Sequence, residues 1–220
     1  AMAIDRELIV NELLGGVNAV ATGMIPPGVN GHREKTALIP FNPEEAKQLL
    51  AEAGYGPGKK VMPPLELVFR EARPDVKIVA EAVASQIKQN LGFEPKLVTK
   101  EWRAMLEAQN RKELPFFHLR WAADYLDPEN FVTFFFASYG PENKIGYKSA
   151  EVDKRTSMAD VMPDGPERLK LYAEAEDIAL ADAAYVPIYF QRDAELINPR
   201  VKGLRESIFG HLPHTTVETE

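Results

Sequence analysis

Two aspartates, Asp124 and Asp127, stand three residues apart in the segment WAADYLDPENFVTFFF, between a tryptophan and a run of phenylalanines. A carboxylate beside aromatic rings can pair with a cation while the rings cover the apolar atoms next to that cation. Asp124 follows a predicted strand at residues 114–121, and binding groups of α/β folds concentrate at the C-terminal ends of strands. With Trp121 and Tyr125 beside it, Asp124 is a candidate cation-binding residue, or else a loop aspartate that hydrogen-bonds its own backbone.

Asp127 has a structural interpretation instead. Pro128 and Glu129 follow it, and this order is typical of a helix N-terminus, where an aspartate caps free N–H groups and the macrodipole favours acids. The helix would bury three phenylalanines: Phe131, Phe134 and Phe135. We therefore expect Asp127 to start a helix and Asp124 to remain available.

The composition narrows the class of protein. The chain has 220 residues, 45% hydrophobic and 27% charged, which is typical of a globular protein with a substantial core. The net charge of −7 argues against a nucleic-acid partner, which usually needs a basic face. The absence of cysteine excludes disulfides and thiolate chemistry. No apolar run approaches the roughly 18 residues of a membrane span.

The sequence carries no enzyme signature of the kinds GxSxG, GxGxxG or GxxxxGK[ST]. His211 and His214 are separated by Pro213, which disfavours a metal site there. Glu174 and Glu176 fall on a predicted helix and are interpreted as a solvated face rather than a catalytic pair. We therefore expect no catalytic residues, no cofactor and no metal.

The strongest fold signal is a βαβ unit. Residues 64–70 and 94–99 are predicted strands, and Gly92 ends the helix predicted between them. That helix carries apolar residues at helical spacing: Val76, Val79, Ala80, Val83, Ile87 and Leu91. Strands joined by such a crossover should be parallel.

Other elements follow from local signals. Asn42, Pro43 and Glu45 form a capping-box arrangement that starts a helix, and Gly54 ends it. Further helices are predicted near residues 150–160 and 165–183, and further strands at 184–191 and 194–199. One α/β domain accounts for this series.

The first residues, AMAIDRELIVNELLGG, predict a helix that ends at Gly15. One face would carry Ile4, Leu8, Ile9 and Leu13. A targeting signal with a basic start, an apolar centre and a cleavage site is not seen there. A cytoplasmic protein that begins with a helix and a fragment of a longer chain are both open.

Eight segments in order along the chain resemble the periplasmic dipeptide- and oligopeptide-binding proteins of ABC importers. They are AIDRELIVNELLGG, MIPPG, FNPEEAKQLLAEAGY, EW at 101–102, WAADYLDPENF, NKIGYKSAEVD, RLKLYAEAEDIALADAAYVPIY and NPRVKGL. Each is weak alone, but the ordered series is specific. The resemblance implies the second lobe of a two-lobed protein, an α/β lobe with a mixed sheet flanked by helices. Residues 1–220 would be that lobe, without the first lobe and the secretion signal.

The resemblance also implies site residues. Asp124 matches the family aspartate that pairs with a ligand α-ammonium group, and Trp121 matches the aromatic residue beside it. Arg70 falls where dipeptide binders place an arginine for the ligand carboxylate; a solvated arginine at a strand end is the alternative. His118 falls where some relatives carry a basic pocket residue, or is a plain strand histidine. Arg120 departs from the family, which usually has a small residue there, so the local pocket shape does not carry over.

The function implied is capture of di- or oligopeptides between two lobes and delivery to a membrane permease, outside the cytoplasm and without catalysis. Main-chain pairing to an extended peptide would give affinity with little side-chain selectivity. A monomer with no nucleic-acid partner is expected. The alternatives are a non-peptide solute, such as a nickel complex or a sugar, on the same fold, and a hydrolase.

Overall fold

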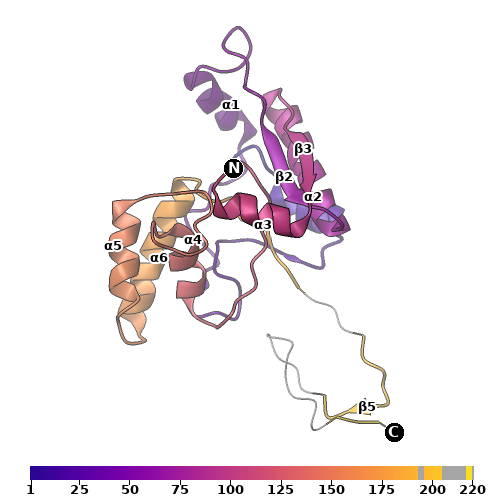
Figure 1. Ribbon diagram of the computed structural model, residues 1–220, viewed down its shortest axis with the longest axis vertical. Helices are drawn as coiled ribbons and strands as arrows, with labels where there is room; N and C mark the ends of the chain where they lie inside the picture. Colours follow the sequence, from indigo (N-terminus) through magenta and orange to yellow (C-terminus); the bar gives the residue numbers. More distant parts are fainter. Residues whose placement is uncertain (193–195, 205–216, 220) are drawn as a thin grey trace. The chain divides into compact units, whose positions relative to one another are not determined.

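The computed structural model describes residues 1–192, 196–204 and 217–219 (Figure 1). The chain divides into two compact units, Ala1–Phe190 and Gln191–Glu220. The described part of the second unit contains an antiparallel pair of short strands, β5 (Val201–Lys202) and β6 (Glu218–Thr219). No helix among the described residues is long and apolar enough to cross a membrane. The elements described below all belong to the first unit.

The predicted βαβ unit is confirmed. Strands β2 (Glu66–Arg70) and β3 (Lys96–Lys100) pair in parallel, with Glu66 opposite Lys96 and Arg70 opposite Lys100. The helix α2 (Pro74–Leu91) connects them. Gly92 ends this helix at φ 79°, a left-handed conformation that glycine adopts without a steric penalty.

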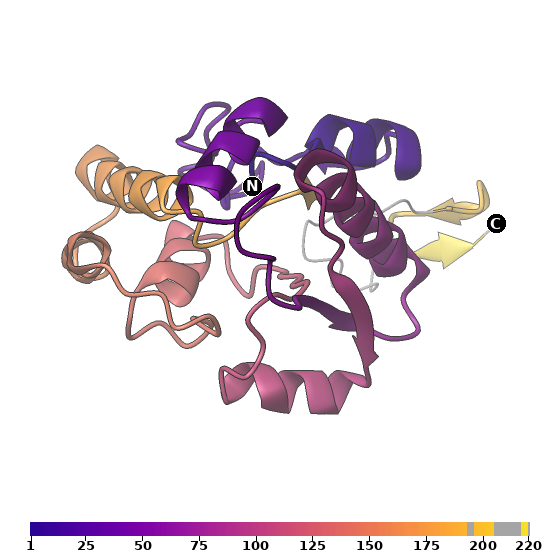
Figure 2. The same ribbon diagram turned by 90° about the horizontal axis from the view of Figure 1, so that it is seen from above.

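Helices cover both faces of this pair of strands, α2 on one face and α3 (Trp102–Asn110) on the other (Figure 2). Successive residues of a strand point to opposite faces. Leu67 and Phe69 therefore pack in the cluster that contains α2, while Val68 packs with Met105 of α3. The end of β2 thus lies between two helices.

The strand predicted at residues 114–121 is reduced to a single bridge, between Val68 and Phe117. Val68 accepts a hydrogen bond from the His118 N–H at 2.9 Å and donates to the Phe116 carbonyl at 3.0 Å. Beyond His118 no further ladder bonds form with β2, because the chain leaves the sheet edge and enters the loop that carries Asp124 and Asp127. The prediction of a full third strand was wrong.

The strand predicted at residues 184–191 is confirmed only as β4 (Tyr189–Phe190), antiparallel to β1 (Ala19–Val20). Of the strand predicted at 194–199, residues 194–195 lie outside the described residues, and 196–199 are not in a strand. The mixed α/β class is confirmed, but the described strands form three separate two-stranded pairs, not one mixed sheet.

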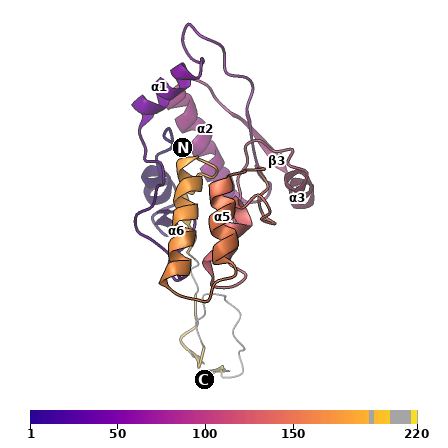
Figure 3. The same cartoon turned by 90° about the vertical axis from the view of Figure 1, so that its left-hand side faces the viewer.

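A helical layer contains α4 (Val132–Phe136), α5 (Ala150–Ala159) and α6 (Pro166–Ala181). Helices α5 and α6 lie side by side (Figure 3). They enclose a core whose largest fully buried side chains include Phe135 and Tyr172. The helices predicted near 150–160 and 165–183 are therefore confirmed.

The first helix is only partly as predicted. Residues Leu8–Leu13 form a π-helix, η1. Ile4 and Ile9 are buried, but Leu8 and Leu13 are 44% and 45% exposed. Hydrogen bonds in a π-helix join residues five positions apart, so Leu8 and Leu13 lie on the same side of η1, and that side faces outward.

The cap of α1 (Pro43–Glu52) is confirmed. The Asn42 Oδ1 accepts a hydrogen bond from the Glu45 N–H at 3.2 Å, and the Asn42 side-chain amide donates to the Glu45 carboxylate at 2.8 Å. Gly54, just after the helix, has φ 88° as the predicted end requires.

Candidate ligand-binding site

Asp127 is a structural residue, as predicted. It caps a 3₁₀ turn, η2 (Pro128–Asn130), by accepting from the Glu129 N–H at 2.9 Å. Both of its carboxylate oxygens also accept from the buried Arg168 guanidinium, at 2.7 and 2.9 Å. Burial opposes the negative charge, but the hydrogen bonds from Arg168 outweigh it and lower the pKa of Asp127.

Asn130 at the end of this turn positions the residues that precede it. Its side chain is fully buried, and its Oδ1 accepts from the Trp121 indole N–H at 3.0 Å and from the Asp124 backbone N–H at 3.1 Å. The Trp121 ring is packed edge-on against Phe135, with centroids 5.3 Å apart. Sequence reasoning missed Asn130, although its place three residues after a predicted cap was a usable signal.

Asp124 is held by its backbone and leaves its carboxylate exposed. Within the described part of the chain, no residue hydrogen-bonds to that carboxylate or forms an ion pair with it. The alternative, a loop aspartate bonded to its own backbone, is therefore not what the structure shows. Tyr125, 39% exposed, packs edge-on against Phe134 beside it. The loop presents one free anion next to aromatic surface.

A hollow of about 220 Å³ lies between the end of β2, α3 and the segment that leads into this loop. Its polar lining consists of Arg70, Arg73, His118 and Arg120, and we call it the cationic hollow. Its apolar lining consists of Val76, Trp102, Met105, Leu119 and Ala122. The structure thus brings Arg70 and His118 together. Asp124 and Tyr125 do not line the hollow; Asp124 follows its last lining residue by two positions.

The arginines of the hollow differ in their partners. Arg70 ends β2 and lies over the Trp102 ring, its guanidinium carbon 4.7 Å from the ring centre. Arg73 instead binds Asp75 through two hydrogen bonds, of 2.9 and 2.5 Å, which raise the pKa of Arg73. Arg120 is exposed and, like Arg70, has no ion pair with any acid in the described ranges.

His118 contributes a neutral ring. The pKa of His118 is lowered to about 4, mainly by burial; the nearby charge of Asp75 opposes this shift, and the charges of Arg73 and Arg120 add to it. At pH 7 the imidazole is uncharged, so it offers one donor and one acceptor but no positive charge.

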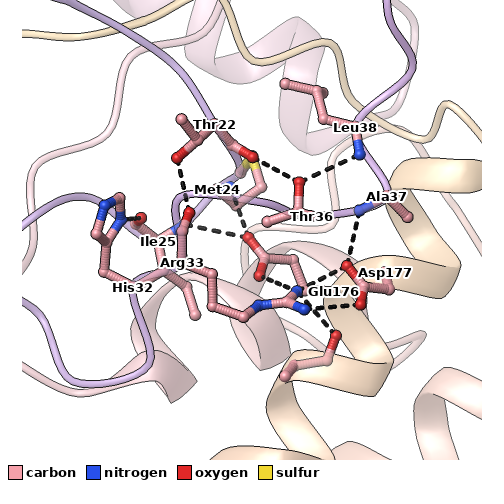
Figure 4. Close-up of polar contacts among 11 residues, drawn as sticks. Thr22, Met24, Ile25, His32, Arg33, Thr36, Ala37, Leu38, Glu176 and Asp177 are labelled. Atoms are coloured by element: carbon pink, nitrogen blue, oxygen red, sulfur yellow. Dashed lines mark hydrogen bonds and ion pairs between the residues drawn. The ribbon is translucent and has the colours of Figure 1, made fainter.

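A second polar cluster lies on α6, and its charged groups pair with one another. Arg33 donates to Glu176 at 2.8 Å and to both oxygens of Asp177 at 2.7 Å (Figure 4). Glu176 also accepts from the backbone N–H groups of Met24, at 2.7 Å, and Ile25, at 3.3 Å. We call these residues the Arg33 cluster; it fastens the loop at residues 22–38 to the helix.

The Arg33 cluster corrects the interpretation of Glu176 as part of a solvated face. Glu176 is 1% exposed, because the loop at residues 22–38 covers it. The approach is so close that a Cβ on Gly23 would lie 2.6 Å from the Glu176 Oε1. Glu176 is buried and accepts three hydrogen bonds from within the protein, so this cluster is structural.

No three His, Cys, Asp or Glu side chains of the described residues come together in a way that could hold a metal ion. His211 and His214 lie outside the described residues.

Comparison with known proteins decides the family. Residues 1–143, more than half of the chain, match the family described as "Bacterial extracellular solute-binding proteins, family 5 Middle". The chain belongs to this family. As a family 5 solute-binding chain it belongs to a group of substrate-binding rather than catalytic proteins.

Several curated relatives resemble this family 5 chain over most of its length. Heme-binding protein A of Haemophilus influenzae is 30% identical over 211 residues, 95% of this chain and 38% of its own. The periplasmic oligopeptide-binding protein OppA of Salmonella typhimurium is 32% identical over 208 residues, 92% of this chain and 37% of its own. The chain therefore spans less than half of the length of the curated relatives it matches.

Solved structures confirm the fold. The murein tripeptide binding protein MppA of Escherichia coli is 29% identical with a TM-score of 0.79, over 92% of this chain and 40% of that one. Haemophilus influenzae OppA in complex with the peptide RPPGFSPFR is 26% identical with a TM-score of 0.82, over 99% of this chain and 44% of that one. The predicted likeness to one part of a peptide-binding protein is confirmed.

Proposed function

We propose that this chain is the second lobe of a two-lobed, extracytoplasmic solute-binding protein that captures short peptides and delivers them to an ABC permease. The observation that carries the proposal is the exposed Asp124 carboxylate, held by Asn130 and close in sequence to the cationic hollow. A peptide has an ammonium group at one end and a carboxylate at the other, so a site with separate opposite charges suits it.

Each site residue has a distinct role in this proposal. Asp124 binds the ligand ammonium group, and Trp121 and Tyr125 provide the apolar surface beside it. Arg70 binds the carboxylate with its planar fork, which the Trp102 ring supports from one side. The neutral His118 ring adds a hydrogen bond without adding charge.

The rest of the binding site belongs to the other lobe. Because the chain spans about 40% of the relatives' length, it supplies only one wall of the cleft. Closure of two lobes would exclude water and strengthen both ion pairs. The periplasmic location, the permease and a monomeric state are parts of the same proposal, supported by relatives named as periplasmic peptide-binding proteins.

A second candidate is a non-peptide solute on the same fold, because relatives are named for heme and, provisionally, for deoxycholate. The discriminating feature is again Asp124. A solute without a cationic group gains nothing from this carboxylate, so its affinity should not change in Asp124→Asn.

Calorimetry on the full-length protein tests the proposal. Asp124→Asn keeps the shape of the side chain but removes its charge, and should cost about 2–5 kcal/mol of peptide affinity. N-acetylation of the peptide should produce a similar loss in the native protein and no further loss in Asp124→Asn. Equal affinity for free and acetylated peptides would contradict the proposal. Release of free amino acids from dipeptides would favour the hydrolase alternative.

A further inference from the structure

The cationic hollow holds more positive charge than one ligand carboxylate can use. Its lining contains three arginines, and Asp75 is the acid that pairs with one of them. This accumulation is local, because the chain as a whole carries a net charge of −7. A cluster of one sign in a concave site attracts ligands of the opposite sign.

The pairing of Arg73 leaves two guanidinium groups for a ligand. Asp75 occupies Arg73 through hydrogen bonds to both of its carboxylate oxygens. The Arg70 guanidinium lies over the Trp102 ring, and no described residue accepts a hydrogen bond from its N–H groups. Arg120 has no acidic partner among the residues that the structure describes.

One carboxylate can bind one guanidinium through two parallel hydrogen bonds. If Arg70 takes the terminal carboxylate of a peptide, then Arg120, on the wall of the same hollow, can bind a second anion. The apolar lining, which includes Trp102, Met105 and Leu119, suits the methylene groups of a short aliphatic spacer between two anions.

From this charge count we infer that the hollow selects peptides whose carboxylate-terminal residue is acidic, with Arg70 and Arg120 each binding one of the two carboxylates. This inference rests on the proposed function and adds a specificity to it. Arg120 is then the residue that sets the specificity. A neutral glutamine in place of the acidic residue would leave the Arg120 guanidinium with a weaker, uncharged acceptor.

Three matched peptides test the inference on the full-length protein: Ala-Ala-Glu, Ala-Ala-Gln and Glu-Ala-Ala. Ala-Ala-Glu should bind at least about tenfold more tightly than Ala-Ala-Gln, since a charge-assisted hydrogen bond is about twice as strong as a neutral one. Glu-Ala-Ala has the same net charge as Ala-Ala-Glu but carries its acid at the other end, so it should bind no better than Ala-Ala-Gln. The preference should decrease as salt is raised.

Arg120→Gln should weaken the binding of Ala-Ala-Glu by at least about tenfold and that of Ala-Ala-Gln much less, so that the preference disappears, because a charge-assisted hydrogen bond is about twice as strong as a neutral one. The matched control is Arg103→Gln. Arg103 is another exposed arginine and does not line the hollow, so this variant changes the net charge equally and should keep the preference.

The outcomes separate the inference from the proposed function. Equal affinity for Ala-Ala-Glu and Ala-Ala-Gln, or an equal loss for both in Arg120→Gln, would overturn the inference alone. A preference that disappears in Arg103→Gln as well would reduce it to general electrostatic attraction and overturn it too. If N-acetylation of Ala-Ala-Gln has no effect, the proposed function fails instead.

Discussion

Arginines in two regions of this chain have opposite surroundings. Arg168, on α6, binds both oxygens of Asp127 at 2.7 and 2.9 Å. Arg33, in the loop at residues 22–38, binds Glu176 and Asp177 of the same helix at 2.7 to 2.8 Å. At the end of β2, Arg70 lies on the Trp102 ring. Together with Arg120 it lines the hollow without an acidic partner among the described residues.

The difference separates groups that hold the fold from groups that remain free to bind. Removing one partner of a buried ion pair leaves an uncompensated charge inside the protein, which strongly destabilises it. An exposed arginine without a partner costs little to keep or to remove, so its contribution has to be sought in ligand affinity. The contrast can be tested by asking which substitutions change stability.

The largest effect is expected for Glu176→Ala. This substitution leaves two backbone N–H groups and one side of Arg33 without their buried acceptor, and should lower the free energy of unfolding by about 3–5 kcal/mol. Urea unfolding measures it. The control is Glu174→Ala on the same helix, whose pair with Arg155 is more exposed and should matter far less. Similar losses in the two variants would break the comparison.

Asp127→Ala should have the next largest effect, about 2–3 kcal/mol of stability. The cap contributes about 1 kcal/mol, and the rest comes from Arg168, whose side chain is 8% exposed and which, among the described residues, keeps only the exposed Asp164 as an acidic partner. Asp127→Asn separates the two terms, because asparagine still caps the turn but cannot pair as an anion.

Thermal unfolding of both Asp127 variants gives these values, with Asp124→Asn as the matched control. Asp124 is exposed and neither caps a helix nor pairs with a described residue. The free energy of unfolding of Asp124→Asn should therefore lie within about 0.5 kcal/mol of the native value. A larger loss for Asp124→Asn than for Asp127→Ala would mean that the two roles are reversed.

The smallest expected effect is the pH dependence of stability that His118 causes. It tests whether His118 adds a positive charge to the hollow. The folded pKa of about 4 lies below an unfolded value of about 6.5, so the unfolded state binds more protons between these two values. The stability that depends on neutral His118 is complete above about pH 6.5 and is lost as the pH falls towards 4. The difference should amount to about 1–3 kcal/mol.

Unfolding curves from pH 7 to pH 4 on the native protein and on His118→Gln test this directly. The variant should lack this part of the pH dependence, while acids that titrate in the same range affect both proteins equally. Identical pH profiles would show that folding does not lower the pKa of His118, and the hollow would then carry a third uncompensated charge below about pH 6.5.

Features that depend on neighbouring residues were predictable from the sequence. The cap at Asn42, the glycine at the end of α2, the cap at Asp127 and the parallel pairing of β2 with β3 all follow from groups close together in the chain. The family resemblance then selected Asp124 from two similar aspartates. Its role as a ligand-binding residue remains a prediction.

The errors arose where distant residues decide the outcome. Glu176 has the sequence surroundings of an exposed helical acid, and only Arg33 and the loop at residues 22–38 make it a buried one. The apolar segment 114–121 has strand propensity, but β2 offers it bonds at Val68 alone. The π-helix was not predicted either, because the apolar spacing was interpreted with the α-helical period, whereas the i→i+5 pairing of η1 leaves Leu8 and Leu13 on its exposed side.

The Arg33 cluster also determines when the loop at residues 22–38 can fold relative to its synthesis. The hydrogen bond from Met24 to Glu176 joins residues 152 positions apart, and β1 pairs with β4 across a similar separation. A ribosome makes the loop at residues 22–38 long before it makes α6, so that loop must wait, with its N–H groups bonded to water. Contacts of such long range close slowly, and segments that wait for them stay open to chaperones and proteases. Residues 22–38 are thus synthesised before α6 but reach their final places only after it.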